Sequence, residues 1–185
     1  YLNIAKRGYE NPSETAFYPL WPMIARFAQS FAPTTLQVQT ANLLSLAAFG
    51  FSLFLIYKLM KILIGASGAA WTVFLFALNP NSVFHAIAYP ESLFSLLAVL
   101  FLLQSFEFLK APTIGVGALL TVTAAAMSAS RPIIPQFISS AIAAFIIIGI
   151  TFKNAAGIEQ FMKSCVTWIG VSTLGVIAGY LPYGL

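Results

Sequence analysis

Six long apolar stretches are the feature of this chain that most restricts its fold. Each is roughly 17–25 residues long, the length at which a helix crosses a hydrocarbon core of about 30 Å. Only 8% of the residues are charged, whereas a soluble domain carries about three times as many. We therefore expect an all-α polytopic membrane protein with about six transmembrane helices. The expected spans are Leu36–Tyr57, Ile62–Leu78, Leu93–Leu109, Thr113–Ala129, Ile133–Phe152 and Cys165–Leu181.

The charged residues divide between the two ends of these spans. Lys58–Lys61 is a short basic connector, so the positive-inside rule places it in the cytoplasm. Alternation of the spans then puts Lys110, Lys153 and Lys163 on the same side. The opposite side receives the remaining basic residues, three of the five acids and the one histidine, which are Lys6, Arg7, Arg26, Arg131, Glu10, Glu14, Glu91 and His85.

The non-cytoplasmic side also holds every proline except Pro112. Proline breaks helices, so this side is expected to consist of irregular loops, which near a membrane can line a wet cavity. We expect the protein to work on this face. The net charge of +4 comes from basic residues scattered at the membrane boundaries, without a basic stripe, which excludes nucleic-acid binding.

Two domains are expected. Residues 1–35 form a non-cytoplasmic loop, and residues 36–185 form a single bundle of transmembrane helices. Within the loop, apolar residues from Phe17 to Phe31 recur at helical spacing, while Arg26 and Gln29 fall on the other side. A short helix of this kind lies in the membrane interface. We expect a structural plug, in which Arg26 meets either lipid phosphate or substrate.

Asn79–Ser82 predicts a turn, with Ser82 capping a short helix over 83–89. Pro90 then starts another helix with Glu91 in its first turn. Both polar candidates here have a structural alternative. A carboxylate at Glu91 complements the helix dipole, and a lone His85 is commonly a hydrogen-bonded interface residue.

No metal and no cofactor are expected. One histidine, no aspartate and a single cysteine, Cys165, within an apolar stretch cannot supply the three or four ligands of a zinc site.

Arg131 is a lone guanidinium between two apolar stretches. An ionisable residue near bilayer depth costs several kcal/mol unless it reaches the headgroups or a partner. Two interpretations stay open. Arg131 anchors the end of a helix by snorkelling, or it binds a phosphate through its forked donors.

Four segments carry a resemblance to a known family. Their order and spacing resemble the PIG-V mannosyltransferases of the polytopic glycosyltransferase C superfamily, over essentially the whole chain. The first and fourth segments are the specific ones. The segments are Tyr-Leu-Asn-Ile-Ala-Lys-Arg-Gly-Tyr (1–9), Ala-Phe-Tyr-Pro-Leu-Trp-Pro (16–22), Asn-Pro-Asn-Ser-Val-Phe (79–84) and Ala-Tyr-Pro-Glu-Ser-Leu-Phe (88–94).

The resemblance implies transfer of mannose from a polyprenyl- or dolichyl-phosphate donor to a lipid or glycan hydroxyl on the non-cytoplasmic face. It also implies a catalytic aspartate a few residues before Tyr1, for which Glu10 and Glu14 are weak substitutes. The residues that match the family's motifs are Gly8, Tyr9, Phe17, Pro19, Tyr89, Glu91 and Ser92. The substrate-binding candidates are Arg131, Glu91, His85, Tyr89, Tyr9 and Arg26, with Lys6 as a further phosphate ligand.

The sequence has no initiator Met, and we expect it to be an internal piece of a longer integral membrane protein that contacts membrane lipids. The expected location is the plasma membrane in a prokaryote and the endoplasmic reticulum in a eukaryote. Two other functions stay open. One is a transporter or lipid flippase, although the spans lack the midplane ionisable groups typical of transporters. The other is a non-catalytic subunit of a membrane complex.

Overall fold

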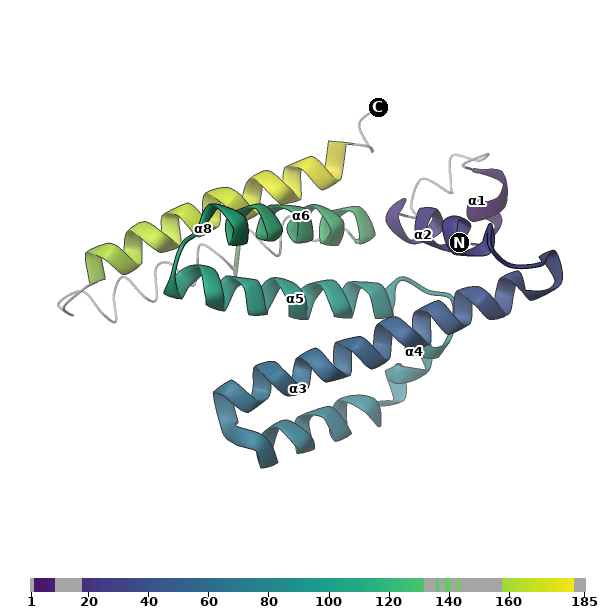
Figure 1. The fold of residues 1–185 in the computed structure, drawn as a ribbon, viewed down its shortest axis with the longest axis horizontal. Coiled ribbons are helices and arrows are strands. Elements are labelled where there is room, and N and C mark those ends of the chain that lie inside the picture. Colours follow the sequence, from purple (N-terminus) through teal and green to yellow (C-terminus); the bar gives the residue numbers. More distant parts are fainter. Residues whose placement is uncertain are drawn as a thin grey trace. The chain divides into compact units, whose positions relative to one another are not determined.

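The computed structural model describes residues 2–8, 18–131, 136, 139, 140, 143 and 158–181. The chain divides into two units, Tyr1–Val99 and Leu100–Leu185, each of which is described by itself. Among the described residues every regular element is a helix, which confirms the all-α expectation (Figure 1). The α-helices are α1 (Leu2–Arg7), α2 (Leu20–Gln29), α3 (Gln37–Ala77), α4 (Val83–Ala86), α5 (Glu91–Lys110), α6 (Ile114–Ser130) and α8 (Ile158–Tyr180), with short 3-10 helices η2 (Thr34–Leu36) and η3 (Pro80–Ser82).

Three of the described helices are long and apolar enough to cross a membrane. They are α3 with 41 residues, α5 with 20 and α8 with 23, and α6 is a shorter apolar helix. An α-helix rises about 1.5 Å per residue, so 20 residues match the thickness of a hydrocarbon core. These lengths confirm the expected membrane-protein class. The expected span Ile133–Phe152 lies outside the described residues, apart from a few isolated positions.

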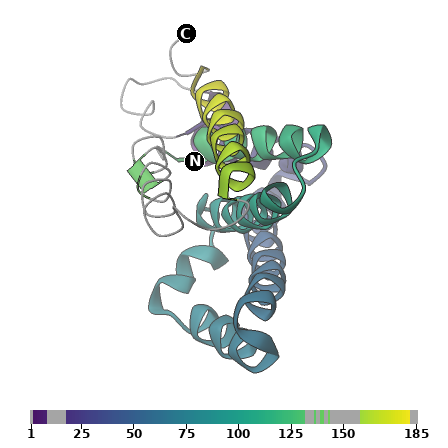
Figure 2. The same ribbon diagram turned by 90° about the vertical axis from the view of Figure 1, so that its left-hand side faces the viewer.

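The boundary between the first two expected spans was wrong. Residues 58–61, expected as a connector, are helical, and α3 instead bends at Gly65. Gly65 has φ 79° and ψ 175°, a backbone conformation that is essentially restricted to glycine. The bend separates a first arm, 37–64, from a second arm, 66–77, which runs back towards α4 (Figures 1 and 2).

The expected faces of the interfacial helix were partly wrong. α2 buries Trp21, Ala25 and Gln29, and the Gln29 amide Nε2 donates to the Gln37 carbonyl at 3.2 Å. This bond ties the end of α2 to the start of α3. Gln29 was expected on the polar side, but a polar side chain is buried without penalty when it finds a hydrogen-bond acceptor. Large apolar residues are exposed instead, namely Met23 and Phe27 of α2 and Phe31 just after it.

The starts of α5 and α6 follow the sequence signals closely. α5 begins at Glu91, directly after Pro90, with the carboxylate in its first turn as expected. At α6 the Thr113 hydroxyl accepts a hydrogen bond from the Val116 backbone N–H at 3.3 Å, the usual N-cap arrangement.

In the second unit, two glycines bring α6 and α8 into direct backbone contact (Figures 1 and 2). A Cβ at Gly175 would overlap the Thr121 carbonyl, and one at Gly179 would overlap the Ala125 carbonyl. Glycines four residues apart form the small-residue motif that lets membrane helices approach closely. Because the contacts advance along both helices in the same direction, α6 and α8 run parallel.

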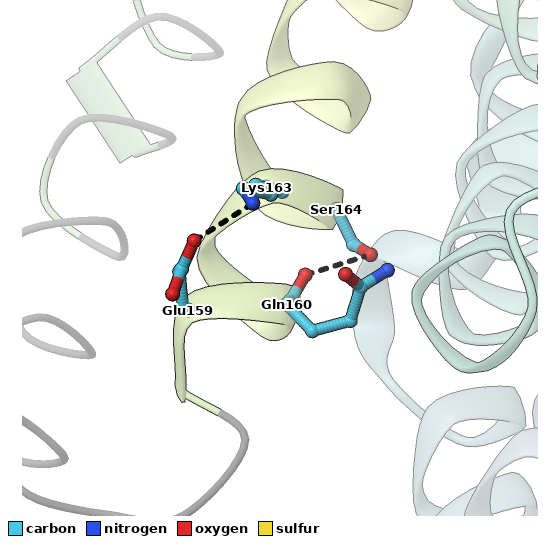
Figure 3. A network of polar contacts seen from close by, with 4 residues as sticks. All are labelled: Glu159, Gln160, Lys163 and Ser164. Atoms are coloured by element: carbon cyan, nitrogen blue, oxygen red, sulfur yellow. Dashed lines mark hydrogen bonds and ion pairs between the residues drawn. The ribbon is translucent and has the colours of Figure 1, made fainter.

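The parallel arrangement separates the charged residues of the second unit. Lys110 ends α5 just before α6 begins, and Lys163 lies near the start of α8, where its Nζ pairs with the Glu159 carboxylate at 2.7 Å (Figure 3). Arg131 follows the last residue of α6. The two lysines therefore lie at one end of the α6–α8 pair and Arg131 at the other, as the sequence predicted.

Candidate functional site

The loop between α4 and α5, Ile87–Pro90, is the centre of the candidate site in the first unit. Most of its carbonyls have defined donors. The indole Nε1 of Trp21 donates to the Ala88 carbonyl at 3.1 Å, and the Ser45 hydroxyl donates to the Tyr89 carbonyl at 3.3 Å. A buried backbone carbonyl without a partner is costly, so these two side chains, from α2 and α3, hold the loop in one conformation.

The Trp21–Ala88 hydrogen bond joins two of the segments that carry the family resemblance. Trp21 belongs to the segment 16–22 and Ala88 begins the segment 88–94. Trp21 is only 1% exposed, so its indole acts as a buried support rather than as a ligand. Segments 67 residues apart in the chain thus form one structural cluster.

The predicted cap of the short helix before this loop was wrong. The Ser82 hydroxyl caps no helix but donates to the Phe76 carbonyl at 2.9 Å. Asn79 caps the preceding 3-10 helix η3 instead, because its side chain accepts from the Asn81 backbone N–H at 2.9 Å. The short helix α4 ends at Ala86, three residues earlier than expected, where Ile87 becomes extended.

His85 lies in α4 and is held on two sides. Its ring stacks on the Phe49 ring with 4.4 Å between centroids and 10° between planes. Its Nδ1 lies 3.2 Å from the Ser92 hydroxyl oxygen, and the same hydroxyl donates to the His85 backbone carbonyl at 2.9 Å. The ring is half-buried and Ser92 is fully buried. A histidine fixed in this way has a defined orientation.

The position of His85 along α3 follows from its ring partner Phe49. Phe49 is 12 residues beyond Gln37, the first residue of α3, which corresponds to about 18 Å along the helix axis. His85 therefore lies well within the length of the first arm rather than at its end.

Tyr89 and Glu91 lie on either side of Pro90, close to His85 in sequence. Tyr89 is 43% exposed, and its ring meets the Phe84 ring edge-on with 6.2 Å between centroids. Glu91 is half-buried at the first position of α5. The structure thus brings three of the predicted site residues, His85, Tyr89 and Glu91, into one short stretch of the first unit.

The other predicted site residues lie outside the stretch from His85 to Glu91. Arg26 is exposed on α2 in the first unit, and Arg131 is half-buried after α6 in the second unit. Lys6 lies in α1. The candidates Tyr9, Glu10 and Glu14, and the motif residue Phe17, lie outside the described residues.

Within the described part of the chain, no three histidine, cysteine, aspartate or glutamate side chains are grouped so as to hold a metal ion. A groove of about 450 Å³ lies beside the start of α6, near Thr113, Thr121 and Val171, and no titratable side chain lines it. This groove lacks the groups that acid–base chemistry needs. The stretch around His85 is therefore the better candidate site.

Sequence reasoning missed the supporting roles of Ser45, Phe49 and Trp21. Trp21 was placed in an apolar stripe, and nothing distinguished Ser45 from the other small polar residues of the spans. Their partners are 67 residues away for Trp21 and 44 for Ser45. No local sequence signal indicates such pairings.

Comparison with known proteins identifies relatives of this chain. Residues 1–167 match a family described as Mannosyltransferase (PIG-V). A protein named GPI mannosyltransferase 2, from Drosophila melanogaster, is 27% identical over 128 residues, which cover 61% of this chain and 28% of the relative. The chain thus spans less than a third of that relative's length. No solved structure matches the chain.

Proposed function

Since the chain belongs to the PIG-V mannosyltransferase family, we propose that its protein transfers mannose from a polyprenyl- or dolichyl-phosphate donor to a hydroxyl of a lipid or glycan acceptor. The observation that carries the proposal is the hydrogen bond from Trp21 to Ala88, because it assembles two family-like segments around His85, Tyr89 and Glu91. The name of the Drosophila melanogaster relative, a GPI mannosyltransferase, favours a glycolipid as acceptor.

The reaction requires one bond to form and one to break. The acceptor hydroxyl oxygen bonds to the anomeric carbon of mannose, its proton passes to a base, and the lipid phosphate leaves with the electrons of the broken C–O bond. The phosphate needs no proton at neutral pH, so the protein's main contribution there is charge stabilisation. We assign this contribution to Arg131, whose guanidinium matches phosphate geometry, with Arg26 and Lys6 as further candidates.

The reaction is proposed to take place on the non-cytoplasmic side, in the endoplasmic reticulum of a eukaryote or at the plasma membrane of a prokaryote. Lys110 and Lys163 lie at the end of the α6–α8 pair opposite Arg131, and lysines favour the cytoplasmic side. In this arrangement residues 1–35 form the outer loop, and residues 36–185 belong to one membrane domain. His85, Tyr89 and Glu91 then contribute to the sugar or acceptor pocket.

Transfer by the full-length protein in liposomes tests the proposal. Labelled dolichyl-phosphate mannose is the donor, and Arg131→Ala is expected to lower kcat/KM at least about 100-fold, the scale seen when a donor to a developing oxyanion is removed. Arg131→Lys keeps the charge and should retain part of the activity. Lys163→Ala is the control, because that side chain is exposed at the opposite end of the unit.

Two results would contradict the proposal at different levels. Unchanged transfer by Arg131→Ala would remove the assignment of that residue. Transfer by the wild-type protein from GDP-mannose, with none from the lipid-linked donor, would overturn the donor class.

A further inference from the structure

The groove in the second unit shares no residue with the candidate site. Its volume is about 450 Å³, which lies within the range of pockets that bind small molecules. The walls come from the end of α5, the connection to α6 and the facing parts of α6 and α8. Its apolar lining includes Phe108, Ile114, Ala118 and Val171.

Three threonine hydroxyls also line the groove, but each already bonds to the backbone of its own helix. Thr113 accepts from a backbone N–H at 3.3 Å, and Thr121 and Thr167 donate to backbone carbonyls at 3.0 Å and 2.9 Å. No titratable side chain lines the groove. A ligand inside it is therefore stabilised mainly by burial of apolar surface, which favours a hydrocarbon chain.

The groove begins where the helices end. Its wall includes Ile114, the first residue of α6, which is 94% exposed, and it reaches Thr121, two turns further along the helix. Two turns correspond to about 10 Å, a third of a hydrocarbon core of about 30 Å. In a membrane this position is level with the upper part of a lipid acyl chain.

Two exposed charges of opposite sign lie at the mouth of the groove. Glu107 and Lys110 belong to the last turn of α5, together with the lining residue Phe108. Within the part of the chain that the structure describes, Glu159 and Lys163 pair at 2.7 Å, whereas Glu107 and Lys110 pair neither with each other nor with another charge. Both remain able to bind a ligand.

This combination of charges selects among lipid headgroups. Basic pockets between membrane helices bind anionic headgroups, but here Glu107 would repel a headgroup that carries only negative charge. A headgroup with a phosphate and an ammonium group matches both side chains. A primary ammonium has three N–H donors for a carboxylate, which a quaternary ammonium lacks.

We propose that the groove binds a zwitterionic phospholipid with a primary ammonium group, of the phosphatidylethanolamine type. One acyl chain enters the groove, Lys110 binds the phosphate and Glu107 binds the ammonium group. The lipid comes from the leaflet that meets the end of α5. This inference does not depend on the proposed mannosyl transfer.

Native mass spectrometry of the full-length protein in detergent tests the proposal. The probes are dioleoyl-phosphatidylethanolamine, dioleoyl-phosphatidylcholine and dioleoyl-phosphatidylglycerol, which share their acyl chains. The wild-type protein is expected to bind the ethanolamine lipid about three- to fivefold more tightly than the other two, the scale of one exposed ion pair. Equal binding of the three lipids would overturn the assignment of the headgroup.

Glu107→Gln separates the two charges at the mouth. This variant should lose the preference for the ethanolamine lipid and bind the anionic glycerol lipid more tightly than the wild-type protein does. Glu159→Gln is the matched control, because it removes an exposed carboxylate that already pairs with Lys163. It should keep the wild-type order of the three lipids, and a loss of that order in both variants would contradict a specific role of Glu107.

Ala118→Phe tests the groove itself. Ala118 is an exposed lining residue, so a larger side chain can fill the groove without disturbing the helix contacts. Exclusion of even two CH₂ groups should weaken binding of all three lipids at least about tenfold. Val122→Phe adds bulk at a residue of α6 that is 65% exposed and lies outside the lining, and should bind as the wild-type protein does.

Two further results would overturn the proposal. One is unchanged lipid binding by Ala118→Phe. The other is a lipid-free dimer in the wild-type spectrum that Ala118→Phe abolishes, because a second copy of the chain would then occupy the groove. Melting temperatures establish that the variants are folded, and the Glu107→Gln comparison stays decisive if Ala118→Phe is not.

Discussion

The two units of this chain are stabilised by different means. In the first unit, side chains from α2, α3 and α5 donate to backbone carbonyls at the end of α4 and in the loop after it, as Trp21, Ser45 and Ser92 do. In the second unit, Gly175 and Gly179 let two helices touch along their backbones. The comparison indicates that directed hydrogen bonds fix an irregular loop, whereas two regular helices are joined mainly by close packing, together with a long hydrogen bond from Thr121 Oγ1 to the Val171 carbonyl at 3.4 Å.

Gly179→Leu is expected to have the largest effect on stability. A side chain there would overlap the Ala125 carbonyl, so α6 and α8 would have to separate. Overpacking of a tight contact costs about 1–3 kcal/mol and occasionally more, and we expect about 3 kcal/mol here because the obstacle is backbone. The melting temperature of the full-length protein in detergent measures the loss.

Gly170→Ala in the same helix is the control, since no atom lies within 4 Å of the added Cβ. It should leave stability unchanged or raise it by up to about 1 kcal/mol through helix propensity. A Gly179→Leu protein that melts at the wild-type temperature would show that backbone contact does not hold the second unit together.

Trp21→Phe is expected to have the largest effect among the hydrogen bonds of the first unit. The Ala88 carbonyl would lose the donor that lies 3.1 Å away, and an unsatisfied buried carbonyl costs about 1–3 kcal/mol. Mannosyl transfer should fall as well, because Ala88 precedes Tyr89 and Glu91 in the candidate site.

Trp71→Phe makes the same chemical change at a residue that is 62% exposed, and should alter stability by less than about 0.5 kcal/mol. The two proteins are compared by melting temperature and by transfer from dolichyl-phosphate mannose. Equal values for both would remove the proposed role of Trp21 as the support of the loop.

Trp168→Phe is the corresponding change in the second unit, with a smaller expected effect. Ser105 would lose the indole N–H at 2.9 Å, but its own hydroxyl still donates to the Phe101 carbonyl. No carbonyl is left without a donor, so we expect a loss of about 1 kcal/mol. A loss in melting temperature larger than that of Trp21→Phe would reverse the distinction between the two units.

Glu159→Ala is expected to have the smallest effect. Its ion pair with Lys163 is close at 2.7 Å, but the two side chains are 83% and 68% exposed, and an exposed i,i+4 pair contributes about 0.3–0.5 kcal/mol. Raising the salt concentration should lower the wild-type melting temperature towards that of the variant. A loss above about 1 kcal/mol would mean that charge pairing contributes to the second unit as strongly as its hydrogen bonds.

The helices themselves could largely be predicted from sequence. The starts of α5 and α6 depend on Pro90 and on the capping hydroxyl of Thr113, which act within one turn. The bend at Gly65 could not be placed, because lysines favour helix almost as well as alanine and the basic connector at 58–61 is compatible with a continuing helix. A glycine inside an apolar stretch was the one available signal, and several other glycines in the chain are helical.

The candidate site was predicted in part. His85, Tyr89 and Glu91 are separated by few residues, so any fold would keep them near one another. Their supports are distant in sequence, and the burial of Gln29 depends on an acceptor at Gln37 that only the packing of α2 on α3 provides. Tyr9, Glu10 and Glu14 stay predictions.

The sequence by itself determined that this protein is a set of apolar helices suited to a membrane, because helix length, capping and apolar content act within one segment. The tertiary structure alone decided which donors meet the carbonyls of the Ile87–Pro90 loop, which face of α2 is buried and how closely α6 approaches α8. These outcomes depend on contacts between residues far apart in the chain. The energy of such contacts exists only once the segments have come together.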